Sequence, residues 1–316
     1  MQDHDTQDHH ADEPIVPVGE GDGSAHPTVT DVEPTANQRS QTSDTVSTAV
    51  VESKGGMQMP RLGLGTWQLD DDVAAEMVAA AIEMGYRHID TAQMYGNERG
   101  VGTGIARAGV PADELFVTTK VDNANHEPDA LAESVEQSLE RLGVDRVDLL
   151  LIHWPVEWDR ISATMAALAN VHAGGLTRHI GVSNFTIEQL EKVATMAPIE
   201  ALQVECHPFF QQDELRAWCV DHGWAFTAYS PVAQGDVFDD ETLSGIADAH
   251  GVTASAVALA WLIQLDSVAA IPRTSSVDHL RDNFSALDLR LSDDEIASID
   301  ALPARDRLVD PGFAPW

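Results

Sequence analysis

Lysine is nearly absent from this sequence of 316 residues: it occurs at positions 54, 120 and 192, and the other basic residues are arginines. The 18 basic residues face 52 acidic ones, which gives a formal net charge of −34. A surface of this sign repels nucleic acid and anionic membranes, so we expect neither as a partner. It is typical of a protein adapted to molar salt, where screening over roughly 3 Å removes self-repulsion, and fits an ordinary acidic protein less well.

Cysteine and long apolar runs are also scarce. Cys206 and Cys219 are the only cysteines and form no C-x-x-C pair, which favours two free thiols over a disulfide or a metal site. No apolar run is long enough to cross a bilayer, and the N-terminus lacks the basic region, apolar region or twin arginine of a leader. We therefore expect a soluble protein in a reducing cytoplasm.

Apolar periodicity is missing from residues 1–50, which contain ten acids, four histidines and one base, Arg39. Such a segment cannot bury enough apolar surface to offset the entropy of ordering it. The sequence therefore predicts a disordered acidic tail over residues 1–50 and a folded domain over residues 51–316. The run D-H-D-T-Q-D-H-H could hold a metal ion weakly, but a solvated tail is the better interpretation.

From Met57 onward, short apolar runs alternate with amphipathic segments of helical period. The predicted strands are residues 61–65, 88–91, 115–121, 147–154, 179–184, 201–207, 225–230 and 268–273. The predicted helical segments are residues 72–84, 97–108, 127–141, 161–172, 186–195, 212–222, 241–265 and 277–287, with caps at Asp70, at Asn184 with Thr186, and at Thr253. Eight strand–helix units of about thirty residues predict an α/β fold, the (β/α)₈ TIM barrel.

An open doubly wound sheet is the alternative architecture. It normally carries G-x-G-x-x-G after its first strand, whereas L-G-L-G-T-W at 62–67 has no third glycine and no helix directly after it. The barrel is therefore favoured, and its site would lie at the C-terminal ends of the strands. Polar residues stand at or near these ends: Thr66, Asp90, Lys120, His153, Ser183, Asn184, Gln203, Tyr229 and Arg273.

Four of the polar residues suggest one chemical site. Lys120, held charged by Asp90, would lower the pKa of the Tyr95 phenol from about 10 and prepare it to give a proton. His153 could donate a hydrogen bond to a carbonyl oxygen as negative charge develops there. Because the set has no nucleophile, it needs an external hydride, which implies a nicotinamide. Each residue alone is more often a cap, a solvated base or a core residue; their combination favours a site.

The motifs in which these residues stand resemble those of the aldo-keto reductase family, in the family's order, over residues 57–316. The ending D-R-L-V-D-P-G-F-A-P-W and the short segment after His153 resemble the small bacterial and archaeal reductases of the 2,5-diketo-gluconate and methylglyoxal type. The matching motifs are G-L-G-T-W (63–67), G-Y-R-H-I-D-T-A-x-x-Y-x-N-E (85–98), T-T-K (118–120), D-L-L-L-I-H-W-P (148–155), I-G-V-S-N-F (180–185), Q-V-E-C-H-P (203–208), A-Y-S-P (228–231) and I-P-R-T (271–274).

The resemblance implies a role for each matched position. Asp90, Tyr95, Lys120 and His153 would form the catalytic tetrad, with Tyr95 as the acid. The implied cofactor contacts are Ser183, Asn184 and Gln203 at the carboxamide, Tyr229 on the ring, Thr66, Ser230 and the loop to Gly235 along the ribose and pyrophosphate, Arg273 and Thr274 at the 2′-phosphate, Asn283 at the adenine, and His279 as a further cofactor contact. Trp67, His153 and Trp154 are the candidate substrate contacts, and no metal is expected.

The sequence also departs from the family at informative positions. A guanidinium at Arg273 can bind a phosphate bidentately, so we expect NADPH rather than NADH. His279 stands where a second arginine is frequent, which weakens phosphate selectivity and makes it pH-dependent. Val121 and Asp122 replace an apolar-aromatic pair that often lines the substrate pocket. The expected activity is reduction of a small aldehyde, ketoaldehyde or keto-sugar by a monomeric enzyme.

Two other functions are consistent with parts of the sequence. The first is a cofactor-sensing regulatory subunit built on the same barrel, which would bind NADPH tightly without turnover. The second is a metal-dependent hydrolase, because histidines also end strands of the barrel, as they do in such enzymes. Its candidate ligands are His88, Asp90, Lys120, His153, His179 and His207.

Overall fold

The computed structural model describes residues 50–316. The disordered tail predicted over residues 1–50 lies, except for its last residue, outside the described residues. The disorder and the boundary after residue 50 therefore stay predictions.

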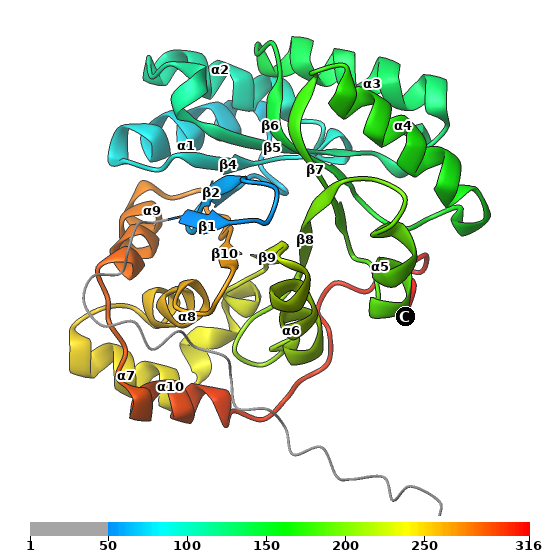
Figure 1. Cartoon of the computed structure of the whole chain (residues 1–316). Helices are drawn as coiled ribbons and strands as arrows, with labels where there is room; N and C mark the ends of the chain where they lie inside the picture. The colour runs from blue at the N-terminus through cyan, green and yellow to red at the C-terminus, as the bar shows by residue number, and fades with distance from the viewer. Residues whose placement is uncertain (1–49) are drawn as a thin grey trace, which may run out of the picture. The chain divides into compact units, whose positions relative to one another are not determined.

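Within residues 50–316, eight parallel strands form one sheet in sequence order, from β3 to β10. The sheet closes on itself because Leu62 and Gly65, at its first strand, bridge to Ala270 and Arg273 in parallel. The helices lie outside the strands (Figure 1), and the predicted barrel is confirmed. The strands are β3 (Leu64–Gly65), β4 (His88–Asp90), β5 (Phe116–Val121), β6 (Val147–Ile152), β7 (Thr177–Ser183), β8 (Ile199–Glu205), β9 (Ala225–Tyr229) and β10 (Val268–Ala270).

The predicted strands are correct in number and order but extend too far. In six of the eight, the prediction continues one to three residues past the observed C-terminal end. Several of these extra residues still donate one hydrogen bond to the neighbouring strand, as Thr91 does to Thr118 and Asn184 to Gln203, before the chain enters the loops at the barrel mouth. Asn184 and Ser230 show why: their φ values are 65° and 49°, in the left-handed region that no strand contains.

Nine of the ten helices in the described part of the chain correspond to predicted segments, with the segment 241–265 divided into two helices, whereas the helix at Asp293–Asp300 was not predicted. Asp70 accepts a hydrogen bond from the backbone of Val73, Thr253 from that of Ala256, and Thr186 forms a capping box with Gln189. Asn184 is not a cap, because its amide belongs to the barrel mouth. The helices are α1 (Asp71–Met84), α2 (Glu98–Ala108), α3 (Pro128–Leu142), α4 (Ile161–Ala173), α5 (Ile187–Val193), α6 (Asp213–His222), α7 (Glu241–His250), α8 (Ala254–Ile263), α9 (Val277–Phe284) and α10 (Asp293–Asp300).

A hairpin that the sequence did not predict packs on the N-terminal ends of the barrel strands. Its strands, β1 (Val50–Glu52) and β2 (Gln58–Pro60), pair antiparallel. Val51, Met57 and Met59 of this hairpin form one buried cluster with residues inside the barrel, including Phe116 and Leu149. The opposite end, where the C-terminal ends of the strands meet, is left to the loops that carry the polar residues.

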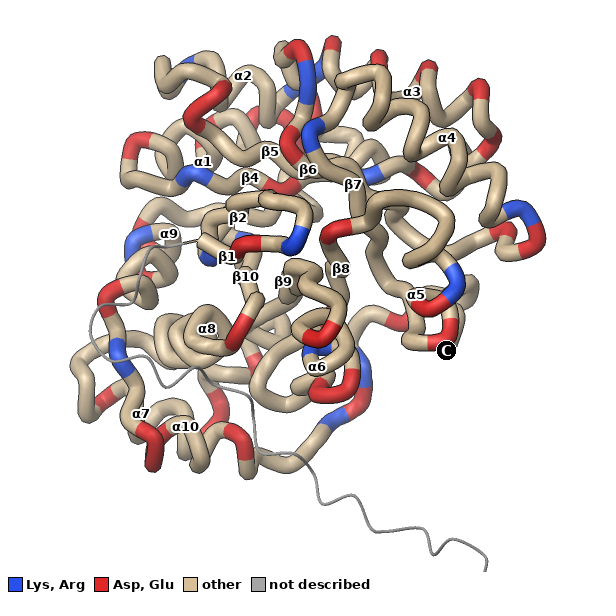
Figure 2. Tube along the Cα trace, in the orientation of Figure 1, with Lys and Arg blue, Asp and Glu red and all other residues tan. Residues whose placement is uncertain are grey.

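Many of the acidic residues lie on the outer helices. Figure 2 shows them along α3, α7 and α10, with few basic positions between them. Among residues 50–316, no single helix has the length and hydropathy of a membrane span, and α7 with α8 reaches that length only as a pair bent by 92°.

Candidate active site

Lys120 lies at the centre of the site, near the end of β5. Its ammonium contacts Asp90, the last residue of β4, at 2.5 Å, and donates to the backbone oxygen of Thr91 at 2.9 Å. The hydroxyl of Tyr95 lies 3.2 Å from the same nitrogen. Burial opposes a charge on Lys120, but Asp90 and Tyr95 together raise the pKa of its amine above the ordinary value. Lys120 is therefore a buried ammonium ion.

Tyr95 differs from the sequence-based expectation in the direction of its pKa shift. Burial is the largest effect and raises the pKa of the phenol; the Lys120 ammonium acts in the opposite direction but does not outweigh burial. Lys120 therefore acts in the predicted direction, but the net shift of the pKa is upward, which the sequence did not predict because it does not show the burial of a side chain. The phenol consequently keeps its proton at neutral pH, as a proton donor must.

His153 follows β6 and stands beside Tyr95. The two rings meet edge to face with their centroids 5.6 Å apart. Burial, followed by the positive charge of Lys120, lowers the pKa of His153 well below its ordinary value. The imidazole is therefore neutral, with one N–H to donate. Its Nδ1 is buried without a hydrogen-bond partner among the described residues.

Further polar side chains from the neighbouring strands complete this group. The amide of Gln203, on β8, donates to the second carboxylate oxygen of Asp90 at 2.8 Å, and Thr66 donates to its backbone oxygen at 3.0 Å. Asn184 donates to the backbone oxygen of His153 at 3.0 Å and accepts from the hydroxyl of Tyr229 at 2.8 Å. The barrel thus brings the four candidate catalytic residues together with Thr66, Ser183, Asn184, Gln203 and Tyr229.

The other candidate cofactor residues form a second group at the turn between β10 and α9. The guanidinium of Arg273 is exposed and donates to the backbone oxygens of Trp67 and Gln68 at 3.3 and 3.4 Å. Among the described residues, it forms no ion pair with any carboxylate, although the chain has 52 acids. Thr274 and Asn283 are buried, His279 is exposed, and Ser230 begins the loop after β9.

The candidate substrate contacts differ in exposure. Trp67 is 41% exposed, whereas Trp154 is buried. Trp154 packs on two residues of the C-terminal segment, Phe313 and Trp316, with ring centroids 5.4 and 5.6 Å away. The segment after α10 therefore reaches the edge of the site. Asp122 accepts from the backbone of Ala124, which fixes one of its oxygens in the loop after β5.

The histidines of the metal-hydrolase alternative do not converge. His88 contacts the backbone oxygen of Pro60, His179 contacts Glu200, and His207 contacts Glu205. Among residues 50–316, no three His, Cys, Asp or Glu side chains are grouped as metal ligands would be. The arrangement around Lys120 therefore suits proton transfer to an oxygen atom, with a buried cation beside the donor.

Two buried acids were missed in the sequence. Glu98, at the start of α2, accepts from Thr119 at 2.6 Å and pairs with Arg141 at 2.7 Å. Glu205, the last residue of β8, accepts from the backbone N–H groups of Leu308 and Val309, each at 2.8 Å. For Glu205, the available signal was an acid within the strand motif Q-V-E-C. A carboxylate buried in a strand requires hydrogen-bond partners, which the motif alone does not identify.

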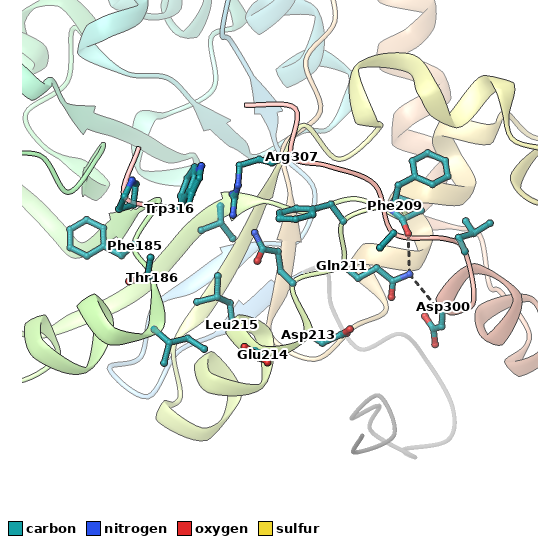
Figure 3. A pocket seen from close by; sticks show the side chains of 18 of the residues that line it. Phe185, Thr186, Phe209, Gln211, Asp213, Glu214, Leu215, Asp300, Arg307 and Trp316 are labelled. Atoms are coloured by element: carbon teal, nitrogen blue, oxygen red, sulfur yellow. Dashed lines mark hydrogen bonds between the residues drawn. The ribbon is translucent and has the colours of Figure 1, made fainter. Parts of the chain in front are cut away.

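A separate hollow of about 840 Å³ lies beside the C-terminal segment, between the N-terminal ends of α5 and α6. None of the four candidate catalytic residues lines it. Figure 3 shows Arg307 and Trp316 on one side of this hollow and Asp213, Glu214 and Leu215 on another. The hollow is therefore distinct from the site around Lys120.

Both cysteines are buried and free. Burial raises the pKa of the Cys206 thiol to about 12 and raises that of Cys219 as well. The two predicted free thiols are confirmed, and neither has the character of a nucleophile.

The chain is similar to known proteins over most of its length. The sequence pattern of the aldo/keto reductase family matches residues 61–304. Methylglyoxal reductase DkgB of Escherichia coli O157:H7 is 42% identical over 265 residues, which cover 82% of this chain and 99% of that protein.

Two solved structures are similar as well. The crystal structure of a putative 2,5-diketo-D-gluconic acid reductase B has a TM-score of 0.82 and 37% identity, and the match covers 84% of this chain and 96% of that one. An aldo-keto reductase of Bombyx mori, in complex with NADP, has a TM-score of 0.77 and 32% identity over 84% and 96% of the two chains. These matches bear out the resemblance that the motifs indicated: the chain belongs to the aldo/keto reductase family and is an enzyme of that class.

Proposed function

We propose that the protein is an NADPH-dependent reductase of small aldehydes, ketoaldehydes or keto-sugars in which Tyr95 donates the proton. The observation that carries this proposal is the buried ammonium of Lys120, which lies 2.5 Å from Asp90 and 3.2 Å from the Tyr95 hydroxyl. The relatives named for methylglyoxal and 2,5-diketo-gluconate support the choice of small, oxygen-rich carbonyl compounds.

The residues present suit an anionic dinucleotide. Arg273 is exposed and unpaired with any carboxylate among the described residues, so its guanidinium is available to a phosphate. Ser183, Asn184 and Tyr229 supply hydroxyl and amide groups beside His153. The Bombyx mori relative was solved with NADP. We propose that these residues hold NADPH, with NADH as the weaker cofactor.

The proposed chemistry divides the work between cofactor and protein. A reduced nicotinamide supplies the hydride that the side chains cannot. The neutral His153 donates a hydrogen bond to the carbonyl oxygen of the substrate and orients it. As the carbonyl carbon accepts the hydride, Tyr95 gives its hydroxyl proton to the oxygen. Lys120 stabilises the resulting phenolate until a proton from solvent restores it.

Replacing Tyr95 with Phe tests the proposal directly. The variant lacks the donated proton, so kcat should fall by about 10²–10⁴-fold, while the Kd for NADPH, measured by fluorescence, stays within about threefold. Tyr86→Phe is a matched control, because the Tyr86 hydroxyl donates to the backbone oxygen of Leu280 on α9 and contacts none of the four candidate catalytic residues. Activity of Tyr95→Phe within tenfold of the native enzyme would remove Tyr95 from this role.

The assay should use methylglyoxal, glyceraldehyde, xylose and a diketo-gluconate with NADPH and with NADH. Tight NADPH binding without turnover on any of them would instead indicate the cofactor-sensing subunit. Loss of activity in EDTA would favour the metal-dependent alternative.

We further propose a monomer that works in a reducing cytoplasm at high salt; the unpaired cysteines and the net charge of −34 support this setting.

A further inference from the structure

Tyr95 stands on a very short element. It is the last residue of a 3₁₀ helix, η1 (Gln93–Tyr95), which connects β4 to α2. The backbone holds this turn through the bonds from Tyr95 N–H to Ala92 and from Gly96 N–H to Gln93. No side chain caps its N-terminus. Such a turn does not fix the place of a phenol by itself, so other contacts must do so.

The amide of Gln93 provides four such contacts. Its nitrogen donates to the hydroxyls of Ser134 and Ser138 on α3, at 3.1 Å each. Its oxygen accepts from the backbone N–H of Asp122 at 2.9 Å and from the amide of Asn125 at 3.0 Å. This uses both donors and both acceptor positions of the side chain. Gln93 therefore anchors the turn to α3 and to the loop after β5.

The bond to Asp122 has a particular consequence. Asp122 follows Lys120 by two residues, so the Gln93 amide joins the backbone that carries the phenol to the backbone that carries the ammonium. The network continues from Ser138 to Glu98 at 3.2 Å, and Glu98 in turn accepts from Thr119, the residue before Lys120. The loop from β4 to α2 is thus anchored near both of its ends to β5 and α3.

We propose that Gln93 is a positioning residue that sets the Tyr95 hydroxyl at its place beside Lys120. All four bonds of its amide go to protein groups, so it acts through Tyr95 and not on the substrate. A misplacement of about 1 Å at a reacting group lowers rates by about 10²-fold. The inference rests on the proposed function, since it assumes that Tyr95 is the proton donor.

The test compares Gln93→Met with Gln93→Glu. Methionine has a similar shape but removes all four hydrogen bonds, so kcat should fall by about 10–100-fold with little change in KM for the carbonyl or in the Kd for NADPH. Glutamate keeps the acceptor for Asp122 and Asn125 but has no N–H for the two serines, whose hydroxyls already donate to other groups, so it should retain more of kcat than methionine but less than glutamine. Gln137→Met is the matched control, because Gln137 is exposed on α3, the helix of Ser134 and Ser138, and its amide donates to Glu133.

A double-mutant cycle shows whether Gln93 acts through Tyr95. Adding Gln93→Met to Tyr95→Phe should not lower the residual single-turnover rate further, whereas a merely structural defect would multiply the two losses. The inference is overturned if Gln93→Met stays within threefold of native kcat, if it weakens NADPH binding as much as kcat, or if the two losses multiply. If Gln93→Met does not fold, Ser134→Ala, which removes one of the four partners, takes its place in the same cycle.

The two proposals fail separately. An active Tyr95→Phe enzyme would defeat the proposed function whatever Gln93 does. An inactive Tyr95→Phe enzyme together with a fully active Gln93→Met enzyme would defeat the positioning inference alone.

Discussion

At the scale of single residues, burial and neighbouring charge compete, and the outcome differs from one side chain to the next. Charge outweighs burial at Lys120, which stays an ammonium ion, while burial outweighs charge at Tyr95, which stays a phenol. At His153 both effects act in the same direction and leave a neutral ring. The site therefore combines one fixed cation, one protonated phenol and one neutral imidazole, which is the set that the proposed reduction of a carbonyl needs.

Arg273 gives a prediction about cofactor choice. Replacing it with Met removes a guanidinium that pairs with no carboxylate among the described residues, so KM for NADPH should rise by about 10–100-fold, as expected for the loss of a charged hydrogen bond worth 1.5–3 kcal/mol. KM for NADH, which lacks the extra phosphate, should change by less than about threefold. Arg281→Met is the control, because Arg281 pairs with Asp278 on the exposed face of α9. Equal losses with both cofactors would contradict the assignment of Arg273 to the phosphate.

The sequence predicted which residue types stand at the strand ends, because parallel strands of a barrel bring their C-terminal ends to one mouth. It did not predict the direction of the Tyr95 shift, which depends on burial. Gln93 was also not predictable. Its partners lie 29 to 45 residues away in sequence, and no local pattern distinguishes an anchoring glutamine from an exposed one.

At the scale of elements, hydrophobic periodicity and helix caps in the sequence predicted most of the barrel. The segments at its two ends depend on contacts with residues that are distant in sequence. The hairpin β1–β2 and helix α10 bury few residues of their own, so their sequences carry a weak periodic signal. The C-terminal segment is the clearest case. After α10 it runs past α6 and ends near α5 (Figure 1). Arg305 pairs with Asp236 in the loop after β9, and Arg307 stacks on Trp316.

Glu205 should control whether this segment stays attached. Glu205→Gln replaces one acceptor oxygen by an amide that faces a backbone N–H, so residues 308–316 should detach more often. We expect faster cleavage near Leu308 in limited proteolysis and a KM for the carbonyl raised about 3–10-fold, because Phe313 and Trp316 would leave Trp154. Glu200→Gln, at the opposite end of the barrel, is the control. Unchanged proteolysis of Glu205→Gln would show that other contacts hold the segment.

The same contact predicts a dependence on pH. Burial opposes the charge of Glu205, but the hydrogen bonds from His207 and from the N–H groups of Leu308 and Val309 outweigh it and lower the pKa of this carboxyl. Because the pKa of Glu205 is lower in the folded protein, its carboxylate stabilises the attached C-terminal segment fully at any pH above the ordinary glutamate pKa. This stabilisation is lost as the pH falls through the lowered pKa. Proteolysis of the native segment should therefore accelerate only below about pH 4.5, the ordinary glutamate pKa, and Glu205→Gln should not show this step. A step at a higher pH would assign it to another group.

At the scale of the whole molecule, the dominant quantity is the net charge of −34. Many of its acids lie on the outer helices (Figure 2), and their mutual repulsion acts through solvent and is open to screening by salt. The buried pair of Lys120 and Asp90 is shielded from salt, because both side chains are at most 2% exposed. Salt should therefore change the stability of the fold more than the protonation states within the site.

Thermal unfolding in potassium chloride tests this reasoning. Because screening weakens repulsion in the folded state, Tm should rise by about 10 °C between 0.05 and 1 M salt and then level off as the Debye length approaches 3 Å. Sodium chloride should act equally, since screening depends on ionic strength.

A variant with Glu133, Glu136 and Glu140 of α3 replaced by Gln changes three exposed acids and raises the net charge from −34 to −31. Its Tm should exceed that of the native protein at 0.05 M and converge with it at 1 M. A Tm that falls with salt, or a gap between the two proteins that persists at 1 M, would mean that the acids act by binding specific ions or water and not by repulsion.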